Sequence, residues 1–272
     1  MMRKVASRLG ALFLVCLLSA CQTTSLEGMK PTYDNAVVKI GANIAKRAGL
    51  NASSLKGTAL LNELGQGLKE KVPVLVFLHG CGGLFYETRQ LLSIVHQLTP
   101  DFVIVAPNSF ARDRPQVCSS GYTVSSLYSE STGWRDMELR YTLSQLQKMA
   151  WVDQANIFIF GHSQGGGTSF GYNGDVPVKG RVSHSGGCYD GSTSRTITGN
   201  GTGASDAVLS LHSPNDPWFK GKSYVTLCEH FARTHPNGTT LSDDTPSHYR
   251  IVSAYGANAK AFKEWIYGIW RK

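Results

Sequence analysis

The stretch that most constrains the fold is residues 156–167, where the apolar run NIFIF ends in the glycine-rich sequence GHSQGGG. The apolar run predicts a buried β-strand, and the residues after Ser163 predict the start of a helix. Gly161 and Gly165 flank Ser163 in the pattern G-x-S-x-G, because a sharp strand-to-helix turn strains the serine backbone and needs small neighbours. A serine at such a turn is a candidate nucleophile, and its activation requires a general base and an acid that orients the base.

Two earlier apolar runs predict a parallel βαβ unit. VPVLVFLHG at 72–80 and FVIVAP at 102–107 are typical of strands covered on both faces, and residues 84–98 between them have helical spacing. The 272-residue chain therefore predicts one α/β domain with a mostly parallel sheet. Further along we expect a polar loop at 108–131, a helix at 134–149, a loop rich in Gly, Ser and Thr at 186–205, a strand at 208–211, and helices at 218–233 and 260–270.

The N-terminus is predicted to be an export signal. Arg3, Lys4 and Arg8 precede the apolar run ALFLVCLL, which is too short to span a bilayer as a helix. Leu18 to Cys21, LSAC, resembles the lipobox of bacterial lipoproteins, whose cysteine is lipidated and becomes the first mature residue. The resemblance implies a protein of the bacterial cell envelope that is anchored to a membrane through Cys21. A plain signal peptide is the alternative.

The expected organisation is a signal peptide at 1–20, a polar tether at 21–35 and one domain at 36–272. Loss of the signal removes three basic residues, so the net charge falls from +8 to +5. The other lysines and arginines are scattered without a basic run, and no nucleic-acid binding is expected. The sequence leaves the oligomeric state open.

Four cysteines follow Cys21, and they are widely spaced. An even number of cysteines in an exported chain favours two disulfides. No C-x-x-C pair and no H-E-x-x-H pattern occurs, so we expect neither a metal site nor a cofactor. The four residues are Cys81, Cys118, Cys188 and Cys228.

Three stretches resemble the α/β-hydrolase fold and, within it, the dienelactone hydrolase family. They are FLHGCGGL at 77–84, APNSFARDR at 106–114 with Cys118 just beyond, and FGHSQGG at 160–166. The resemblance implies a mostly parallel sheet with helices on both faces and a triad in the order Ser, acid, His. The enzyme that names the family carries cysteine at the elbow, whereas this chain has Ser163. The resemblance therefore indicates a serine esterase rather than a dienelactone hydrolase.

The acid expected for the triad is Asp216. It lies in the turn SPNDPW shortly after the strand VLSLH, at the place where the family has its acid. Among the other acids after Ser163, four compete with Asp216, but none of the four follows a convincing strand so directly. These competitors are Asp190, Asp206, Asp243 and Asp244.

His248 in TPSHYR is the expected base, because it precedes the last predicted helix, whereas His230 falls within a predicted helix and His235 just after one. In this interpretation His248 takes the proton of Ser163, Asp216 holds the imidazole tautomer, and an acyl-enzyme forms and is hydrolysed.

The oxyanion of such a reaction needs two preorganised donors, for which we expect the backbone N–H groups of Cys81 and Gln164. A structural role is expected for His79. The relatives that this chain resembles share the HGCGG sequence and a cysteine in the following loop. Parallel strands would also bring both residues to one edge of the sheet. Together these indicate a Cys81–Cys118 disulfide, which leaves Cys188 to pair with Cys228.

The favoured prediction is hydrolysis of small carboxylic esters. A depolymerase of polyesters or aryl esters is an alternative, since Trp134 or Trp218 could line a pocket, although both are also suited to the core. The sequence is also compatible with a serine peptidase on the same fold and with a catalytically inactive binding lipoprotein of the envelope.

Overall fold

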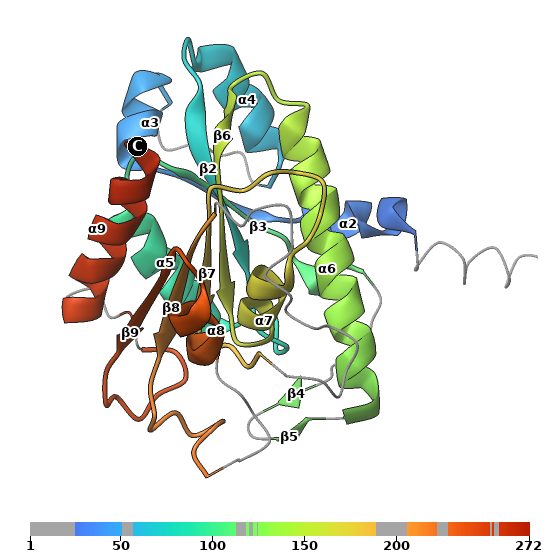
Figure 1. Ribbon diagram of the computed structural model, residues 1–272. Coiled ribbons are helices and arrows are strands. Elements are labelled where there is room, and N and C mark those ends of the chain that lie inside the picture. Colours follow the sequence, from blue (N-terminus) through green and yellow to red (C-terminus); the bar gives the residue numbers. More distant parts are fainter. Residues whose placement is uncertain are drawn as a thin grey trace, which may run out of the picture.

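A seven-stranded sheet forms the centre of the molecule in the computed structural model (Figure 1). The structure describes residues 25–50, 57–112, 118–119, 122–123, 125–188, 206–221, 228–250, 252 and 256–272. The strand order is β1-β3-β2-β6-β7-β8-β9, in which only β1 runs antiparallel to its neighbour. The predicted mostly parallel α/β architecture is confirmed.

The sheet strands are β1 (Val37–Ile40), β2 (Val72–Leu78), β3 (Val103–Ala106), β6 (Val152–His162), β7 (Gly180–His184), β8 (Ala207–His212) and β9 (Gly238–Ser242). The short strands β4 (Cys118–Ser119) and β5 (Tyr122–Thr123) pair separately. The helices are η1 (Leu26–Met29), α2 (Lys30–Asp34), α3 (Ala42–Arg47), α4 (Ala59–Gly67), α5 (Tyr86–Leu98), η2 (Ser109–Ala111), α6 (Ser125–Gln147), α7 (Gln164–Gly171), α8 (Cys228–Thr234) and α9 (Ala257–Trp270).

The sheet is covered on both faces, which explains the continuous apolar runs of β2 and β6. Alternate residues of β2 belong to two different hydrophobic clusters, one on each face of the sheet, because successive side chains of a strand point to opposite faces. Val74 and Val76 pack with side chains of α4 and α6, whereas Leu75 and Phe77 pack with those of α5 and α9. Figure 1 shows α5 and α9 on one side of the sheet and α6 on the other.

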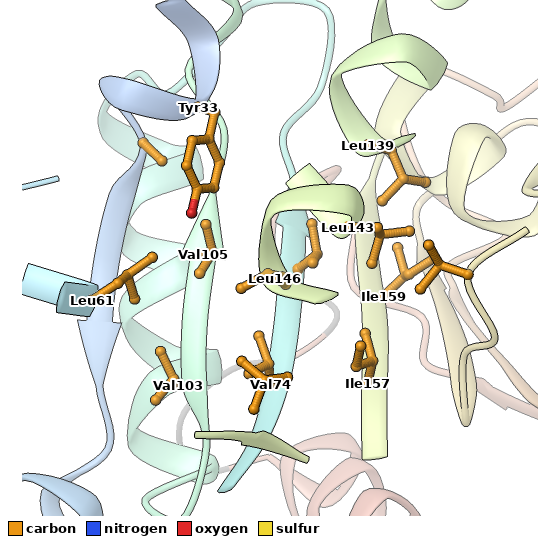
Figure 2. Close-up of a cluster of buried hydrophobic side chains, with 14 of the residues drawn as sticks. Tyr33, Leu61, Val74, Val103, Val105, Leu139, Leu143, Leu146, Ile157 and Ile159 are labelled. Carbon is orange, nitrogen blue, oxygen red and sulfur yellow. The ribbon is translucent and has the colours of Figure 1, made fainter. Parts of the chain in front are cut away.

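The cluster beneath α6 is the larger of the two. Figure 2 shows Leu139, Leu143 and Leu146 of α6 beside Ile157 and Ile159 of β6. All five side chains are fully buried. Burial of one such side chain is worth about 1.5 to 3 kcal/mol, so this helix is held firmly against the strand that leads into the serine elbow.

The packed domain begins earlier than the predicted boundary at residue 36. Residues 26–34, expected to be part of a tether, form η1 and α2. Met29 and Tyr33, four residues apart on one helical face, are buried, and the Tyr33 ring meets that of Tyr141 at a centroid distance of 5.9 Å.

Two other predicted boundaries were wrong. Helix α6 begins at Ser125, inside the region expected to be a loop. The helix expected at 218–233 is helical only from Cys228 among the described residues, because residues 216–220 form a turn in which Phe219 N–H donates to the Asp216 carbonyl at 3.0 Å. Strands β1, β7 and β9 were not predicted.

The predicted disulfide between Cys188 and Cys228 is present, with Cα atoms 4.7 Å apart. It joins the chain after β7 to the start of α8. Cys81 is also disulfide-bonded. The side chain of Cys118, its predicted partner, lies outside the described residues, so that pairing stays a prediction.

Across the described ranges, no helix is both long and apolar enough to cross a membrane. The predicted signal at 1–20 and the predicted lipidation site Cys21 lie outside these ranges.

Candidate active site

Ser163 occupies a strained turn between β6 and α7. Its φ of 56° and ψ of −119° place a non-glycine residue in a region that L-residues rarely adopt. Backbone hydrogen bonds hold the turn: Ser163 N–H donates to the His184 carbonyl at 2.9 Å, and Gly166 N–H and Gly167 N–H donate to the Ser163 carbonyl at 2.9 and 3.3 Å. The turn predicted from G-x-S-x-G is therefore present, with the serine at its tip.

The glycines of this turn are required by close backbone contacts. A Cβ atom at Gly161 would collide with the Gly165 carbonyl, and one at Gly165 would collide with the carbonyl of Leu78 at the end of β2. The tight approach lets the elbow sit directly against β2.

His248 and Asp216 form a buried pair. The Nδ1–H group of His248 donates to Asp216 Oδ2 at 2.7 Å, and the side chains are 4% and 1% exposed. The other carboxylate oxygen, Oδ1, accepts a hydrogen bond from Trp218 N–H at 2.9 Å. Because both oxygens are engaged, the carboxylate is fixed in orientation and holds the proton of neutral His248 on Nδ1. The Nε2 lone pair of His248 is then the atom that can accept a proton.

Two side chains tie the acid turn to the segment that carries the histidine. Ser213 Oγ donates to the Thr245 carbonyl at 2.7 Å, and Asn215 Nδ2 donates to the Asp244 carbonyl at 3.2 Å. These bonds connect the chain after β8 with the chain after β9 and set the distance between Asp216 and His248. Ser213 and Asn215 could not be identified from the sequence, because their partners are backbone atoms distant in the chain.

The structure brings the three predicted triad residues to one edge of the sheet. Ser163 follows β6 directly, Asp216 follows β8 and His248 follows β9, and the carboxyl ends of these parallel strands lie together. The ring of His162, the residue before Ser163, has its centroid 4.9 Å from that of His248.

The competing acids and histidines have other roles or positions. Asp206 pairs with Arg181, whose Nη2 donates to its Oδ1 at 3.1 Å, and Asp243 accepts a hydrogen bond from Thr245 N–H at 2.9 Å. Asp244 and His230 are exposed. His235 accepts a hydrogen bond from Asn237 N–H at 3.2 Å. Asp190 lies outside the described residues.

The segments that carry the two predicted oxyanion donors both lie beside the serine. A Cβ atom built on Gly80 would lie 3.5 Å from Ser163 Oγ, so the Gly80–Cys81 peptide passes next to the hydroxyl. Gln164 follows the serine as the first residue of α7, and its Nε2 donates to Ser131 Oγ at 2.7 Å. The side chain of Gln164 is thereby held toward α6, while its backbone stays at the elbow.

Two other histidines form a buried pair next to the elbow. His162 and His184 are neighbours in register on β6 and β7, and their Nδ1 atoms are 3.0 Å apart. Burial lowers the pKa of His184 to about 3 and the pKa of His162 well below its ordinary value. Both rings are therefore neutral near pH 7, and one Nδ1–H group donates to the other Nδ1 atom.

Aromatic side chains surround His248. The ring centroids of Trp218, Phe219 and Tyr249 lie 5.2 to 5.6 Å from that of His248. Trp218, expected either in a pocket or in the core, is half-buried beside the base. Trp134 instead packs under the guanidinium of Arg112, which lies 4.6 Å from the ring centroid.

In the described part of the chain, no group of three His, Cys, Asp or Glu side chains is arranged to hold a metal ion.

Comparison with known proteins identifies the fold. No protein-family model and no curated protein matches the chain. Est1E from Butyrivibrio proteoclasticus, solved with ferulic acid, is 12% identical, covers 88% of this chain and 96% of its own, and has a TM-score of 0.54. The Bacillus cereus carboxylesterase is 16% identical, covers 86% and 93%, and has a TM-score of 0.52.

A dienelactone hydrolase-like promiscuous phosphotriesterase from metagenomic libraries is 18% identical, covers 75% of this chain and 89% of its own, and has a TM-score of 0.51. At these identities the similarity shows the fold alone. The chain has the α/β-hydrolase fold, as the sequence resemblance implied.

Proposed function

We propose that this protein is a serine hydrolase that cleaves carboxylic esters through Ser163, His248 and Asp216. The observation that carries the proposal is the buried hydrogen bond of 2.7 Å between His248 and Asp216 at the edge of the sheet where the strained Ser163 also lies. A fixed carboxylate, an oriented imidazole and a serine at a strand-to-helix elbow are the three parts of this chemistry.

The proposed reaction has two stages. His248 Nε2 accepts the hydroxyl proton as Ser163 Oγ attacks the ester carbonyl, and Asp216 stabilises the imidazolium that forms. The resulting oxyanion accepts hydrogen bonds from the backbone N–H groups of Cys81 and Gln164. The imidazolium then protonates the departing alkoxide. Water, activated by His248, hydrolyses the acyl-enzyme and releases the acid.

One observation favours esters with an aromatic or extended apolar group. Phe85, Tyr86 and Phe110 are three of the four large apolar side chains that are exposed among the described residues. Phe85 lies against Gly82 and Phe110 against Gly83, so both rings rest on the loop that follows Gly80. An aryl-ester or polyester substrate would cover these rings, and we place such a depolymerase second to hydrolysis of small esters.

The proposal includes attachment to a membrane of the bacterial cell envelope through lipidated Cys21. It is supported by the signal and the LSAC sequence. A lipid anchor would hold the domain near a membrane while leaving the edge of the sheet free to bind substrate.

A fluorophosphonate probe and a series of p-nitrophenyl esters of graded chain length test the proposal. The wild-type protein is expected to react with the probe at Ser163 and to hydrolyse the esters. Ser163→Ala should stay folded and lose both properties, with kcat lower by several orders of magnitude. Ser169→Ala in α7 is a matched control, since Ser169 is buried on the same helix and donates to the Ile159 carbonyl at 3.5 Å. A loss of only a few-fold in Ser163→Ala would contradict the proposal.

A further inference from the structure

A buried cluster of charged and polar side chains lies beneath the loop that follows β2. Arg135 and Glu138, on α6, are both fully buried, and Arg135 Nη1 lies 3.3 Å from Glu138 Oε2. Arg112 donates to Glu138 Oε1 at 3.1 Å, and Ser109 Oγ donates to Glu138 Oε2 at 2.6 Å. Arg135 Nη1 thus lies within reach of both Glu138 and the His79 ring.

His79 links this cluster to the backbone. Arg135 Nη1 donates to His79 Nε2 at 2.9 Å, so this nitrogen carries no proton. The proton of neutral His79 is then on Nδ1, which donates to the Gly80 carbonyl at 2.7 Å. Arg135 Nη2 also points to the Gly80 carbonyl at 3.3 Å. The guanidinium therefore reaches the Gly80 carbonyl both directly and through His79.

The orientation of the Gly80 carbonyl decides where the Cys81 N–H group points. Both groups belong to one planar, trans peptide unit, in which C=O and N–H point in opposite directions. A carbonyl held toward the buried guanidinium therefore turns the N–H group away from the cluster. The Cβ position of Gly80 lies 3.5 Å from Ser163 Oγ, which places this peptide beside the nucleophile.

We infer that Arg135 is a positioning residue: it holds the Gly80–Cys81 peptide so that the Cys81 N–H group is directed to the oxyanion of the reaction. The inference rests on the proposed function, in which this N–H is an oxyanion donor. A cation that binds the carbonyl also polarises the peptide and makes its N–H group a stronger donor.

Among the described residues, the guanidinium groups of Arg112 and Arg135 both contact the carboxylate of Glu138. Stability alone gives little reason to bury Arg135, because apolar packing is often at least as stabilising as a buried ion pair.

The test compares Arg135→Met with Arg140→Met, a matched control on the same helix whose guanidinium pairs with Asp136. Arg135→Met is expected to lower kcat for p-nitrophenyl esters by about 10-fold to 100-fold with KM little changed, because the interaction is made in the transition state. Inhibition by a trifluoromethyl ketone, whose adduct with the serine carries an oxyanion, should weaken by a similar factor. Arg140→Met should change neither.

Arg135→Lys is a second variant for the case that Arg135→Met does not fold. Lysine keeps the positive charge but cannot bond both His79 and the Gly80 carbonyl with one planar group. This variant should show an intermediate loss of kcat. A folded Arg135→Met or Arg135→Lys variant with wild-type kcat and wild-type inhibition would overturn the inference.

An NMR measurement separates this inference from the proposed function. The amide resonance of Cys81 in the free protein is expected to shift in Arg135→Met and Arg135→Lys and to stay in place in Arg140→Met. An unchanged Cys81 resonance would overturn the inference even if the wild type hydrolyses esters. Conversely, a wild type that neither hydrolyses esters nor reacts with the fluorophosphonate would refute the proposed function, while the Cys81 resonance would still report on the positioning.

Discussion

His248 and Asp216, 32 residues apart in the chain, are joined by a buried hydrogen bond of 2.7 Å. The contact depends on strands β8 and β9, which run parallel and therefore end at the same edge of the sheet. Ser213 and Asn215 then fasten the two segments to each other. The relationship is therefore built into the fold rather than created by substrate binding.

Asp216→Asn is expected to lower kcat by about 10³-fold to 10⁴-fold, because an amide can donate to Nδ1 and so stabilise the wrong imidazole tautomer. Asp244→Asn is the matched control, since Asp244 is exposed in the neighbouring segment and its contact to Asn215 is made by the backbone carbonyl, which the substitution keeps. Steady-state kinetics and reaction with a fluorophosphonate probe measure the effect. Equal activity of the two variants would exclude Asp216 as the acid.

Two of the triad candidates could be named from the sequence because each has a strong local signal. Ser163 lies in a motif that only a tight turn requires, and Asp216 follows an apolar strand. Strands β7 and β9 could not be predicted, because GRVSH and GTTLS each contain a single large apolar residue and become strands by pairing with β8. Their stability comes from neighbours that are distant in the sequence.

The cluster around Arg135 was missed for a related reason. Arg135 and Glu138 are spaced like an ordinary ion pair on an exposed helical face. Only the packing of α6 against the chain after β2 shows that both are buried. The one local signal was a pair of opposite charges within a helix whose other face is apolar.

The aromatic side chains beside the site give a prediction about substrate preference. Phe110→Ala is expected to reduce kcat/KM for an ester with an aromatic acyl group, p-nitrophenyl benzoate, by about 3-fold to 10-fold more than for p-nitrophenyl acetate, because the larger acyl group would lose an apolar contact. Leu26→Ala serves as the control, since Leu26 is exposed to a similar extent but lies in η1. Equal effects on both esters would show that Phe110 does not contact the acyl group.

The buried pair His162 and His184 predicts loss of stability in acid. The folded pKa of His184 is about 3, against about 6.5 in the unfolded chain, and that of His162 is also lowered. Between these values the unfolded state binds more protons than the folded state. The free energy of unfolding should therefore be highest above pH 6.5 and fall toward pH 3, by up to about 1.4 kcal/mol per pH unit for each histidine.

Urea unfolding at several pH values between 8 and 4 measures how the free energy of unfolding depends on pH. His184→Gln keeps a neutral hydrogen-bonding side chain and should flatten the slope. His230→Gln, a change of an exposed histidine on α8, should leave the slope as it is. A His184→Gln variant with the wild-type slope would show that His184 does not cause the loss of stability in acid.

Anchoring through Cys21 predicts how the full-length chain fractionates. Wild-type protein made in a bacterial host should incorporate labelled palmitate and sediment with membranes, because a diacylglyceryl group plus an amide-linked acyl chain gives stable attachment. Cys21→Ser should lose both properties, whereas Cys16→Ser, a change within the apolar run, should keep them. Labelling and sedimentation of Cys21→Ser as in the wild type would contradict lipidation at this residue.

The last prediction concerns the disulfide of Cys81, for which Cys118 is the expected partner. Cys81 is buried and follows β2, and Cys118 begins β4 in the chain after β3. A bond between them would constrain the loop after Gly80 through the Cys81 sulfur and would not involve the backbone N–H group of Cys81. In the chain-entropy model, closing a loop of this length stabilises the fold by about 3 to 4 kcal/mol.

Peptide mapping without reductant should recover the Cys81 and Cys118 peptides as one linked species. The double variant Cys81→Ser/Cys118→Ser should have a lower melting temperature and a lower kcat, because its oxyanion loop is less constrained. Cys188→Ser/Cys228→Ser removes the disulfide at α8 and should lower the melting temperature with a smaller effect on kcat. A free Cys81, or Cys81 linked to Cys188 or Cys228, would refute the pairing.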